Sequence, residues 1–438
     1  MKKSRYNHIR LIQGQTVLFN VMSEKICVMD SLLGEIYTAN EPDIIQDRHA
    51  EFYSYLCENE FLIDESVDEV AKLEKLWEEN DNSESNFSVI INPTLNCNMS
   101  CWYCYEQHEG NLNMRPELLE AIKRLILSKF SLPTLTSFHL GFFGGEPLLK
   151  FDSVCKSLMD FTRSINLEYN KVISFSFVTN GYLLSEEIIK YFKQIGSPIS
   201  LQITLDGNRH RHDMVRKNRN GNPSYDTILH NCKKLLECPN VHLTLRCNFT
   251  SDSIACFTDV ITDLKQVLGD EPANINNLTI DFHRVWQDQN RQISNRDDIT
   301  ITEETVKKLF ANEGFNLTAR KDINRYRCYA DRMNHALINF DGNVFRCTAR
   351  DFTPQRAEGK LTESGEIVWN TLSDERNRIK WANLTCKSCE IYPICSGNCS
   401  QSKLEQGTQT GCSHHYSQQQ KQDIITRRLN LLIEQAKQ

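Results

Sequence analysis

The sequence has no long hydrophobic run and no excess of positive charge. No stretch of about 18 or more apolar residues occurs, so no segment is expected to span a bilayer. The basic start, MKKSRYNHIR, is not followed by an apolar core, so a secretory signal is not expected. The net charge of −7 argues against nucleic acid or an anionic membrane surface as the main partner. We therefore expect a cytoplasmic protein.

The sequence is instead rich in cysteine, with 17 residues that fall into two groups and several single positions. Cys97, Cys101 and Cys104 lie close together, and five more cysteines fall within residues 386–412. In a reducing compartment, clustered cysteines are more often metal ligands than disulfides. The isolated ones are expected to be small buried apolar residues, among them Cys27, Cys57, Cys155 and Cys232.

Residues 1–85 are expected to form a first domain. Their pattern predicts two strands and two helices, at Thr16–Val21, Lys25–Met29, Asp43–Cys57 and Ser66–Glu79. A polar link from Glu78 to Asn86 then marks a boundary.

Residues 87–315 alternate between strand and helix patterns. Strands are expected at Ser88–Asn92, Phe138–Phe143, Ser174–Thr179, Ser200–Leu205, Val241–Asn248 and Leu278–Val285. Helices are expected at Pro116–Lys129, Phe151–Ile165, Ser185–Gln194, Asp226–Leu236, Ser253–Leu268 and Thr302–Ala311. Such units predict a parallel sheet with right-handed crossovers. Six units are too few for a closed (β/α)8 barrel, so we expect an α/β fold with a partial (β/α)6 TIM-like barrel, or a doubly wound sheet.

The remaining chain is short of long helices and dense in cysteine. We expect a loop-rich domain over residues 320–415, stabilised by metal clusters, and a C-terminal helix over residues 416–438.

The first cysteine group directly follows the first barrel strand, at the strand end where parallel α/β folds bind ligands. Three thiolates in one loop predict a 4Fe–4S cluster with one iron left open for a small molecule. The alternative is a structural zinc site completed by His108.

The spacing Cys-x3-Cys-x2-Cys, with an aromatic residue before the last cysteine, resembles the signature of the radical S-adenosylmethionine (SAM) superfamily. The resemblance implies that the open iron binds the amino and carboxylate groups of SAM. An electron from the cluster would then break the sulfonium and give a 5′-deoxyadenosyl radical. By the same resemblance, Tyr103 would pack on the adenine.

Further motifs follow the next strands, each of which taken alone is an ordinary polar turn. Gly144-Gly145-Glu146-Pro147 is similar to the family's GGEP motif, which binds the methionine amino group. The others resemble signatures of peptide-modifying radical enzymes: Thr179-Asn180-Gly181, Thr204-Leu205-Asp206-Gly207 and His212-Asp213-x-x-Arg216. The resemblance places Asn180 in the cofactor site, Thr204 on the nucleoside and Arg216 on the cofactor carboxylate. Arg246 and Asn248 resemble a further RxN signature of these enzymes, and structural hydrogen bonding is an equally open role for them.

The C-terminal cysteines number seven from Cys328 to Cys412 and read Cys-x2-Cys-x5-Cys-x3-Cys over residues 386–399. The Cys-x2-Cys step is a chelating spacing, and seven thiolates are too many for one zinc ion. Two clusters, or two zinc knuckles, would account for the number. The order resembles the SPASM domain of radical enzymes that modify peptides and proteins. That resemblance implies one auxiliary 4Fe–4S cluster on Cys386, Cys389, Cys395 and Cys412. It implies a second on Cys328, Cys347 and Cys399, which makes three clusters in all.

The substrate is expected to be a precursor peptide. Sulfatase-maturating relatives carry an Asp base just after the second SPASM cysteine, whereas Cys347 is followed by Thr348, and Asp351 is the nearest carboxylate. The N-terminal domain is similar to winged-helix elements that bind a leader peptide as an added edge strand. We expect the product to be an intramolecular thioether, C–C or C–O crosslink. An external flavodoxin- or ferredoxin-type protein would supply the electron, and no catalytic base is assigned. The alternative enzymatic function is formylglycine formation in a sulfatase. The non-enzymatic alternative is a zinc or electron-transfer scaffold protein.

Overall fold

The computed structural model consists of two compact units. The barrel unit comprises Glu84–Thr318 and Asn334–Ser373, and the terminal unit comprises Met1–Ser83, Ala319–Met333 and Asp374–Gln438. The structure describes residues 1–12, 14–106, 108, 110–269, 276–289, 296–318, 328–397, 399–407, 411–412 and 414–436. Within these ranges, no helix is both long enough and apolar enough to cross a membrane.

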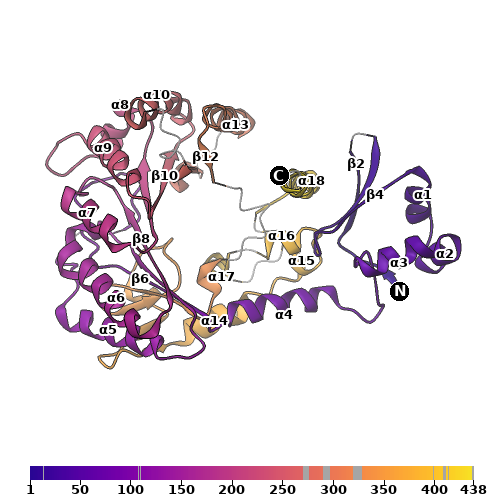
Figure 1. Cartoon of the computed structure of the whole chain (residues 1–438), viewed down its shortest axis with the longest axis horizontal. Helices are drawn as coiled ribbons and strands as arrows, with labels where there is room; N and C mark the ends of the chain where they lie inside the picture. The colour runs from indigo at the N-terminus through magenta and orange to yellow at the C-terminus, as the bar shows by residue number, and fades with distance from the viewer. Residues whose placement is uncertain are drawn as a thin grey trace. The chain divides into compact units, whose positions relative to one another are not determined.

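The barrel unit is built on a parallel sheet whose strands follow chain order (Figure 1). Its strands are β6 (Asn86–Ile91), β7 (Ser137–Phe142), β8 (Val172–Thr179), β9 (Ile199–Leu205), β10 (Val241–Phe249), β11 (Leu278–Arg284) and β12 (Asn316–Leu317). The six predicted strands are confirmed, as is their parallel pairing. Their carboxyl ends therefore share one edge, where the predicted motifs lie.

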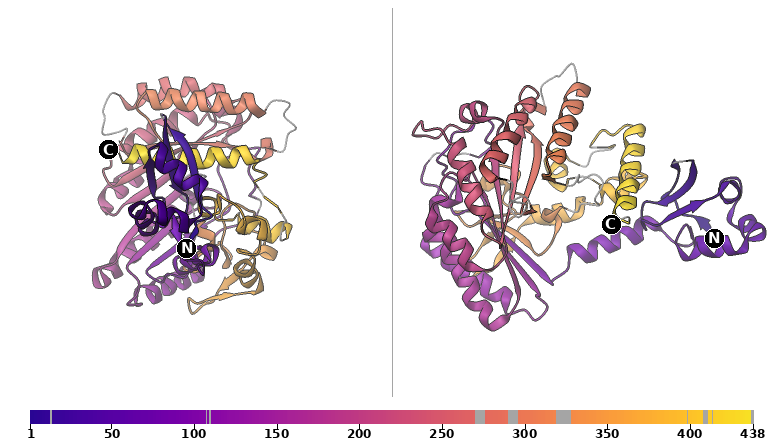
Figure 2. Two further views of the ribbon diagram at one scale, coloured as in Figure 1. Left: turned by 90° about the vertical axis from the view of Figure 1, so that its right-hand side faces the viewer. Right: turned by 45° about the horizontal axis from the view of Figure 1, so that its top comes forward.

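Helices run along the outside of this sheet (Figure 2). They are α5 (Pro116–Phe130), α6 (Ser157–Tyr169), α7 (Glu186–Ile195), α8 (Arg209–Val215), α9 (Tyr225–Leu236), α10 (Phe257–Leu268), α12 (Trp286–Gln289) and α13 (Arg296–Asn312). Shorter turns are η1 (Pro147–Lys150), the π-helix η2 (Phe151–Lys156) and η3 (Ile254–Cys256). In α7, Ile188, Phe192 and Ile195 recur at helical spacing and are buried against the sheet. The sequence patterns missed α8, which is short.

The sheet continues beyond β6 into strands that the sequence patterns did not predict. β13 (His335–Ile338) pairs in parallel with β6, and β14 (Asn343–Phe345), β15 (Gly359–Leu361) and β16 (Ile367–Trp369) follow antiparallel. They complete an 11-stranded sheet, with the turn η6 (Pro354–Arg356) between β14 and β15. Strands this short leave no two-residue periodicity to detect. Residues 334–373, which were expected in the loop-rich domain, thus form one compact unit with the barrel.

The N-terminal part of the terminal unit contains an antiparallel sheet followed by helices. The sheet is β2 (Asn7–Ile12), β3 (Gln15–Asn20) and β4 (Ile26–Met29), and β1 (Lys2–Lys3) pairs with β5 (Leu62–Ile63). The helices are α1 (Ser31–Ala39), α2 (Pro42–Arg48), α3 (Ala50–Glu58) and α4 (Glu69–Asp81). The single helix predicted over Asp43–Cys57 is wrong. At His49 φ is −156°, which interrupts the helix, and its side chain caps α3 by accepting from the Phe52 amide at 3.1 Å.

The C-terminal part of the terminal unit carries most of the second cysteine group on short helices. These are α14 (Thr371–Ile379), α15 (Leu384–Lys387), α16 (Tyr392–Cys395), α17 (Ser400–Gln406) and the long α18 (Gln418–Gln435), preceded by the turn η5 (Tyr329–Asp331). Trp77 of α4 stacks on Trp381 with ring centroids 5.4 Å apart and meets Tyr392 edge-on. Both ends of the chain therefore contribute to one core.

Candidate functional site

The loop that carries the first three cysteines is tied to the loops after β7, β8 and α8. The Glu146 amide donates to the carbonyl of Asn96 at 2.9 Å, and the Asn180 side chain donates to Asn98 at 2.7 Å. On another side, the Ser100 amide donates to the carbonyl of Lys217 at 2.8 Å. The motifs that looked like separate polar turns in the sequence therefore meet around one loop.

The two glycines of the GGEP motif are required by close backbone approach. A Cβ on Gly144, where φ is +100°, would lie 2.5 Å from the carbonyl oxygen of Thr94. A Cβ on Gly145 would lie 2.4 Å from the carbonyl oxygens of Leu95 and Asn96. Since real side chains do not approach so closely, only glycine lets this turn pack on the cysteine loop.

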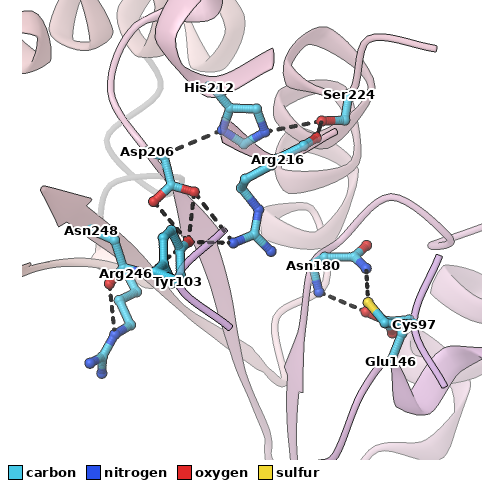
Figure 3. A network of polar contacts seen from close by, with 10 residues as sticks. All are labelled: Cys97, Tyr103, Glu146, Asn180, Asp206, His212, Arg216, Ser224, Arg246 and Asn248. Atoms are coloured by element: carbon cyan, nitrogen blue, oxygen red, sulfur yellow. Dashed lines mark hydrogen bonds and ion pairs between the residues drawn. The ribbon is translucent and has the colours of Figure 1, made fainter. Parts of the chain in front are cut away.

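Glu146 uses its carboxylate to join neighbouring turns. It accepts from the Leu148 amide at 3.0 Å and the Thr179 hydroxyl at 2.7 Å. It also accepts from the Asn180 amide at 2.8 Å (Figure 3). Burial raises the pKa of Glu146, and these three donors oppose that shift. Three donors of the chain leave about one of the four acceptor positions of this carboxylate free, so its contact with a ligand ammonium stays a prediction. The carboxylate thus serves the fold of the turn.

Tyr103 lies at the centre of a buried polar network (Figure 3). Its hydroxyl donates to Asp206 at 2.8 Å and accepts from Arg216 at 2.9 Å and from Asn248 at 3.2 Å. Burial raises the pKa of Tyr103 well above its ordinary value, so the phenol keeps its proton. Its predicted packing on adenine stays a prediction.

The His-Asp-x-x-Arg motif sets the position of Arg216. The buried His212 accepts from the Asp206 amide at 3.4 Å and contacts the Ser224 hydroxyl at 3.1 Å. Burial lowers the pKa of His212, so its ring is neutral. Asp213 accepts from the amides of Ser224 and Tyr225 and so fixes the start of α9.

Arg216 has one buried donor to spare. It pairs with Asp206 at 3.4 Å, but its Nε has no hydrogen-bond partner among the described residues. A buried N–H without an acceptor is costly, so this donor fits an anionic ligand group. This is the donor chemistry that a cofactor carboxylate needs.

The strand register explains the placement of Thr204, Arg246 and Asn248. Thr204, Arg246 and Asp281 stand opposite one another on β9, β10 and β11, and Thr204 is buried. Arg246 pairs with Asp281 at 3.6 Å and donates to Asn248 at 3.1 Å. Arg246 therefore orients Asn248 toward Tyr103, which favours the hydrogen-bonding role for this pair.

Burial favours the protonated form of the three cysteine thiols. Burial raises the pKa of Cys97 to about 12 and that of Cys104 to about 11, and it raises the pKa of Cys101 as well. His108 lies beside Cys104, with Nε2 3.2 Å from the sulfur. Over the described ranges, no set of three or more His, Cys, Asp or Glu side chains is arranged to hold a single metal ion. Three thiols carried by one loop fit a cluster, which would displace their protons.

The terminal unit contains a second cysteine-lined cavity. Cys386, Cys389, Cys395 and Cys412 line it, and Tyr392, His414, Tyr416 and Lys421 complete the wall. Burial raises the pKa of Cys395 to about 11, while the Gly397 amide donates to its sulfur. Four sulfur donors in one hollow fit the ligand set predicted for one auxiliary cluster. Of the other set, Cys328 and Cys399 lie in the terminal unit and Cys347 in the barrel unit, so it stays a prediction.

Several residues beside the cysteine loop escaped the sequence reasoning. Tyr105 stacks on Trp286 with ring centroids 5.8 Å apart, and its hydroxyl donates to the Thr348 carbonyl at 2.8 Å. The guanidinium of Arg350 lies over the Trp286 ring, 5.5 Å from its centroid. Burial raises the pKa of Glu106 to about 8. Trp286 comes just after the carboxyl end of β11, so the strand-end rule applied to β9 would have found it.

Comparison with known proteins agrees with this geometry. Residues 91–247 match the family model described as the Radical SAM superfamily. The radical SAM cyclopropyl synthase TigE of Paramaledivibacter caminithermalis is 23% identical over 337 residues, which cover 69% of this chain and 65% of that protein. Two anaerobic sulfatase-maturating enzymes, of Clostridium novyi and Bacteroides thetaiotaomicron, match over about a third of the chain, at 28% and 29% identity. The chain thus spans from about a third to just under two thirds of these relatives' own lengths.

Two solved structures share the fold. The structure titled native anSMEcpe with bound AdoMet has a TM-score of 0.60 at 18% identity, and covers 80% of this chain and 99% of its own. Streptococcus suis SuiB bound to the precursor peptide SuiA has a TM-score of 0.53 at 14% identity, and covers 94% of this chain and 99% of its own. Residues 91–247 and the motifs gathered around Cys97 are thus similar to the Radical SAM superfamily, and the solved structures share an α/β fold built on a large parallel sheet.

Proposed function

We propose that the chain matures a ribosomally made precursor peptide by abstracting a hydrogen atom and installing an intramolecular crosslink. The proposal rests on one observation above all, the meeting of the cysteine loop with the GGEP, Asn180 and Arg216 segments at one sheet edge. When bound, SAM and a 4Fe–4S cluster supply the radical. The chain's own part is to bind and orient them.

Each residue has a defined part in this proposal. Cys97, Cys101 and Cys104 would hold the cluster, and the close-packed turn at Gly144 and Gly145 would present backbone carbonyls to the methionine amino group. The spare Nε of Arg216 would receive the cofactor carboxylate. In the SPASM region, one auxiliary cluster would sit in the cavity of Cys386, Cys389, Cys395 and Cys412, with Cys328, Cys347 and Cys399 as ligands of another.

A peptide substrate is supported by the N-terminal segment. The structural match to SuiB covers 94% of this chain, so it must include most of residues 1–83. SuiB was solved with a bound precursor peptide. Among the described residues, β4 pairs with β3 alone, so its outer edge is available to an added strand. The winged-helix-like segment would bind the leader there.

Formylglycine formation is less well supported. The position of the expected base is Thr348, whose carbonyl accepts from Tyr105. The nearest carboxylate, Asp351, forms an ion pair with Arg356 at 3.4 Å and accepts from Thr353. An acid held in this way is not poised to take a substrate proton.

The first test is cofactor cleavage. Anaerobically purified protein with iron, treated with dithionite and SAM, should release 5′-deoxyadenosine, and alanine at Cys97, Cys101 and Cys104 should abolish it. Alanine at Cys256, a partly buried cysteine of the barrel unit, is the matched control and should leave cleavage intact. Stoichiometric zinc with little iron would refute the radical proposal.

The second test concerns the product. Co-expression with a short peptide encoded beside the gene should remove the mass of two hydrogen atoms from that peptide without releasing a fragment. Conversion of a sulfatase-derived peptide to formylglycine, with the neighbouring peptide unchanged, would favour the alternative function.

A further inference from the structure

The cysteine loop presents an exposed tryptophan between two cluster ligands. Trp102 stands between Cys101 and Cys104 and is 51% exposed, although large aromatic side chains are usually covered. Its ring meets that of Tyr103 edge-on, with centroids 5.5 Å apart. An exposed tryptophan beside a redox site has the character of an interface anchor.

Two exposed cations flank this loop. Lys217 accepts from the Ser100 amide through its carbonyl, and Arg219 donates from its own amide to the carbonyl of Asn98 at 2.9 Å. Both residues thus touch the loop through main-chain atoms, while their side chains are exposed. Neither side chain forms an ion pair in the described part of the chain, unlike nearby Arg209, which pairs with Asp226 at 2.8 Å.

The charge of this surface differs from that of the whole chain. Among residues 209–219, Arg216 is buried beside Asp206, and Arg209 and Arg211 form ion pairs with Asp226 and Asp252. Lys217 and Arg219 therefore remain as exposed cations without an ion pair in the described residues, in a protein of net charge −7. Lys217 also lines an open hollow together with Asp213, Asp259 and Asp263, and these carboxylates bound the cationic area there. Unpaired positive charge beside a redox centre attracts an acidic partner and speeds its approach.

We propose that Trp102, Lys217 and Arg219 form the docking surface for an acidic flavodoxin that reduces the cluster. The flavodoxin hydroquinone would give up one electron and become the semiquinone, and the oxidised 4Fe–4S cluster would take up that electron. The cluster would then pass it to the sulfonium of SAM. The cations would meet carboxylates around the flavin, and Trp102 would meet its apolar edge. This inference rests on the proposed cluster at Cys97, Cys101 and Cys104.

The test is a double charge reversal, K217E/R219E, in the full-length protein with its clusters. The binding of oxidised flavodoxin at low salt should weaken on the order of tenfold or more, and the difference should shrink at high salt. The rate of 5′-deoxyadenosine formation with flavodoxin hydroquinone should fall in parallel. With methyl viologen, a small cationic reductant, the rate should match that of the wild type, because the loop contacts are made by the main chain.

The matched control reverses two lysines elsewhere on the barrel unit. Lys190 and Lys193 are exposed in the middle and in the last turn of α7, and α7 ends toward the amino ends of the strands. K190E/K193E changes the net charge equally and should leave flavodoxin binding unchanged. If the control weakened binding as much, net charge alone would explain the effect and the docking surface would be wrong.

The outcomes separate the two proposals. No 5′-deoxyadenosine from the wild type with methyl viologen would overturn the radical function itself. Normal turnover with methyl viologen, combined with unchanged flavodoxin binding in K217E/R219E, would overturn only the docking surface. Reduction by a ferredoxin but not by flavodoxin would overturn the choice of carrier.

Discussion

The two cysteine sites are held in place in different ways. The loop at Cys97 is tied by backbone hydrogen bonds to turns that the parallel sheet has already brought together. The cavity at Cys386 is formed by helices of four residues that pack on Trp77 and Trp381. We infer that the barrel unit can form its site before a cluster arrives, whereas the second site depends on its cluster for much of its stability.

Replacement of Cys386 and Cys389 by alanine should therefore have the largest structural effect. The variant should lose one cluster's iron and unfold at a lower temperature, while cofactor cleavage without substrate continues and product formation fails. Iron analysis and thermal unfolding would measure this. The triple alanine variant at Cys97, Cys101 and Cys104 is the counterpart, and it should keep its unfolding temperature. Equal destabilisation of both variants would remove the distinction.

The close-packed turn of the barrel site gives the next largest effect. G144A should cost about 3 kcal/mol of unfolding free energy and weaken SAM binding, because its Cβ would meet the Thr94 carbonyl. Gly196 also has positive φ, at +71°, but nothing lies within 4 Å of its Cβ position. G196A should cost about 1 kcal/mol and leave SAM binding unchanged. If G144A and G196A lowered the unfolding free energy in urea equally, backbone strain alone would explain the cost at Gly144, and the contact with the Thr94 carbonyl would not.

In the terminal unit, His8 predicts a dependence on pH. Glu390 lies 4.0 Å from its ring, but burial outweighs this and, with Arg10, lowers the pKa of His8 to about 4. Between pH 6.5 and 4 the unfolded chain binds the proton more readily, so stability is full above pH 6.5 and is lost as pH falls. The loss should reach about 2 kcal/mol at pH 5. In H8Q, the unfolding free energy measured in urea should fall between pH 7.5 and pH 5 by about 2 kcal/mol less than in the wild type.

Loss of one hydroxyl at the barrel site should have the smallest effect. Y103F leaves Asp206 and Arg216 in contact but deprives Asn248 of its acceptor, at a cost of about 1 kcal/mol. The KM for SAM should rise more than kcat falls, because Arg216 loses a positioning contact. Y169F, which removes an exposed hydroxyl beside Ser131, is the control and should change neither quantity. An unchanged KM in Y103F would show that the network does not position Arg216.

The sequence predicted the barrel strands because each is long, apolar and followed by an amphipathic helix. It predicted that Asn180, Thr204 and Arg216 would lie at one edge because parallel strands share their carboxyl ends. It did not predict β13 to β16, whose few residues form strands only by pairing with β6 and one another. Nor did it predict the polar network at Tyr103, since hydrogen bonds between residues more than 100 positions apart depend on register.

The terminal unit takes its core from both ends of the chain, with Tyr6 and Trp77 packed in one cluster with Tyr392 and Ile424. During synthesis the ribosome releases the last of these segments well after residues 84–373 have emerged. The barrel unit is thus complete while the N-terminal strands and α4 still await their partners. We infer an order of assembly in which the second cysteine cavity closes last, so that its cluster is inserted into a nearly finished chain.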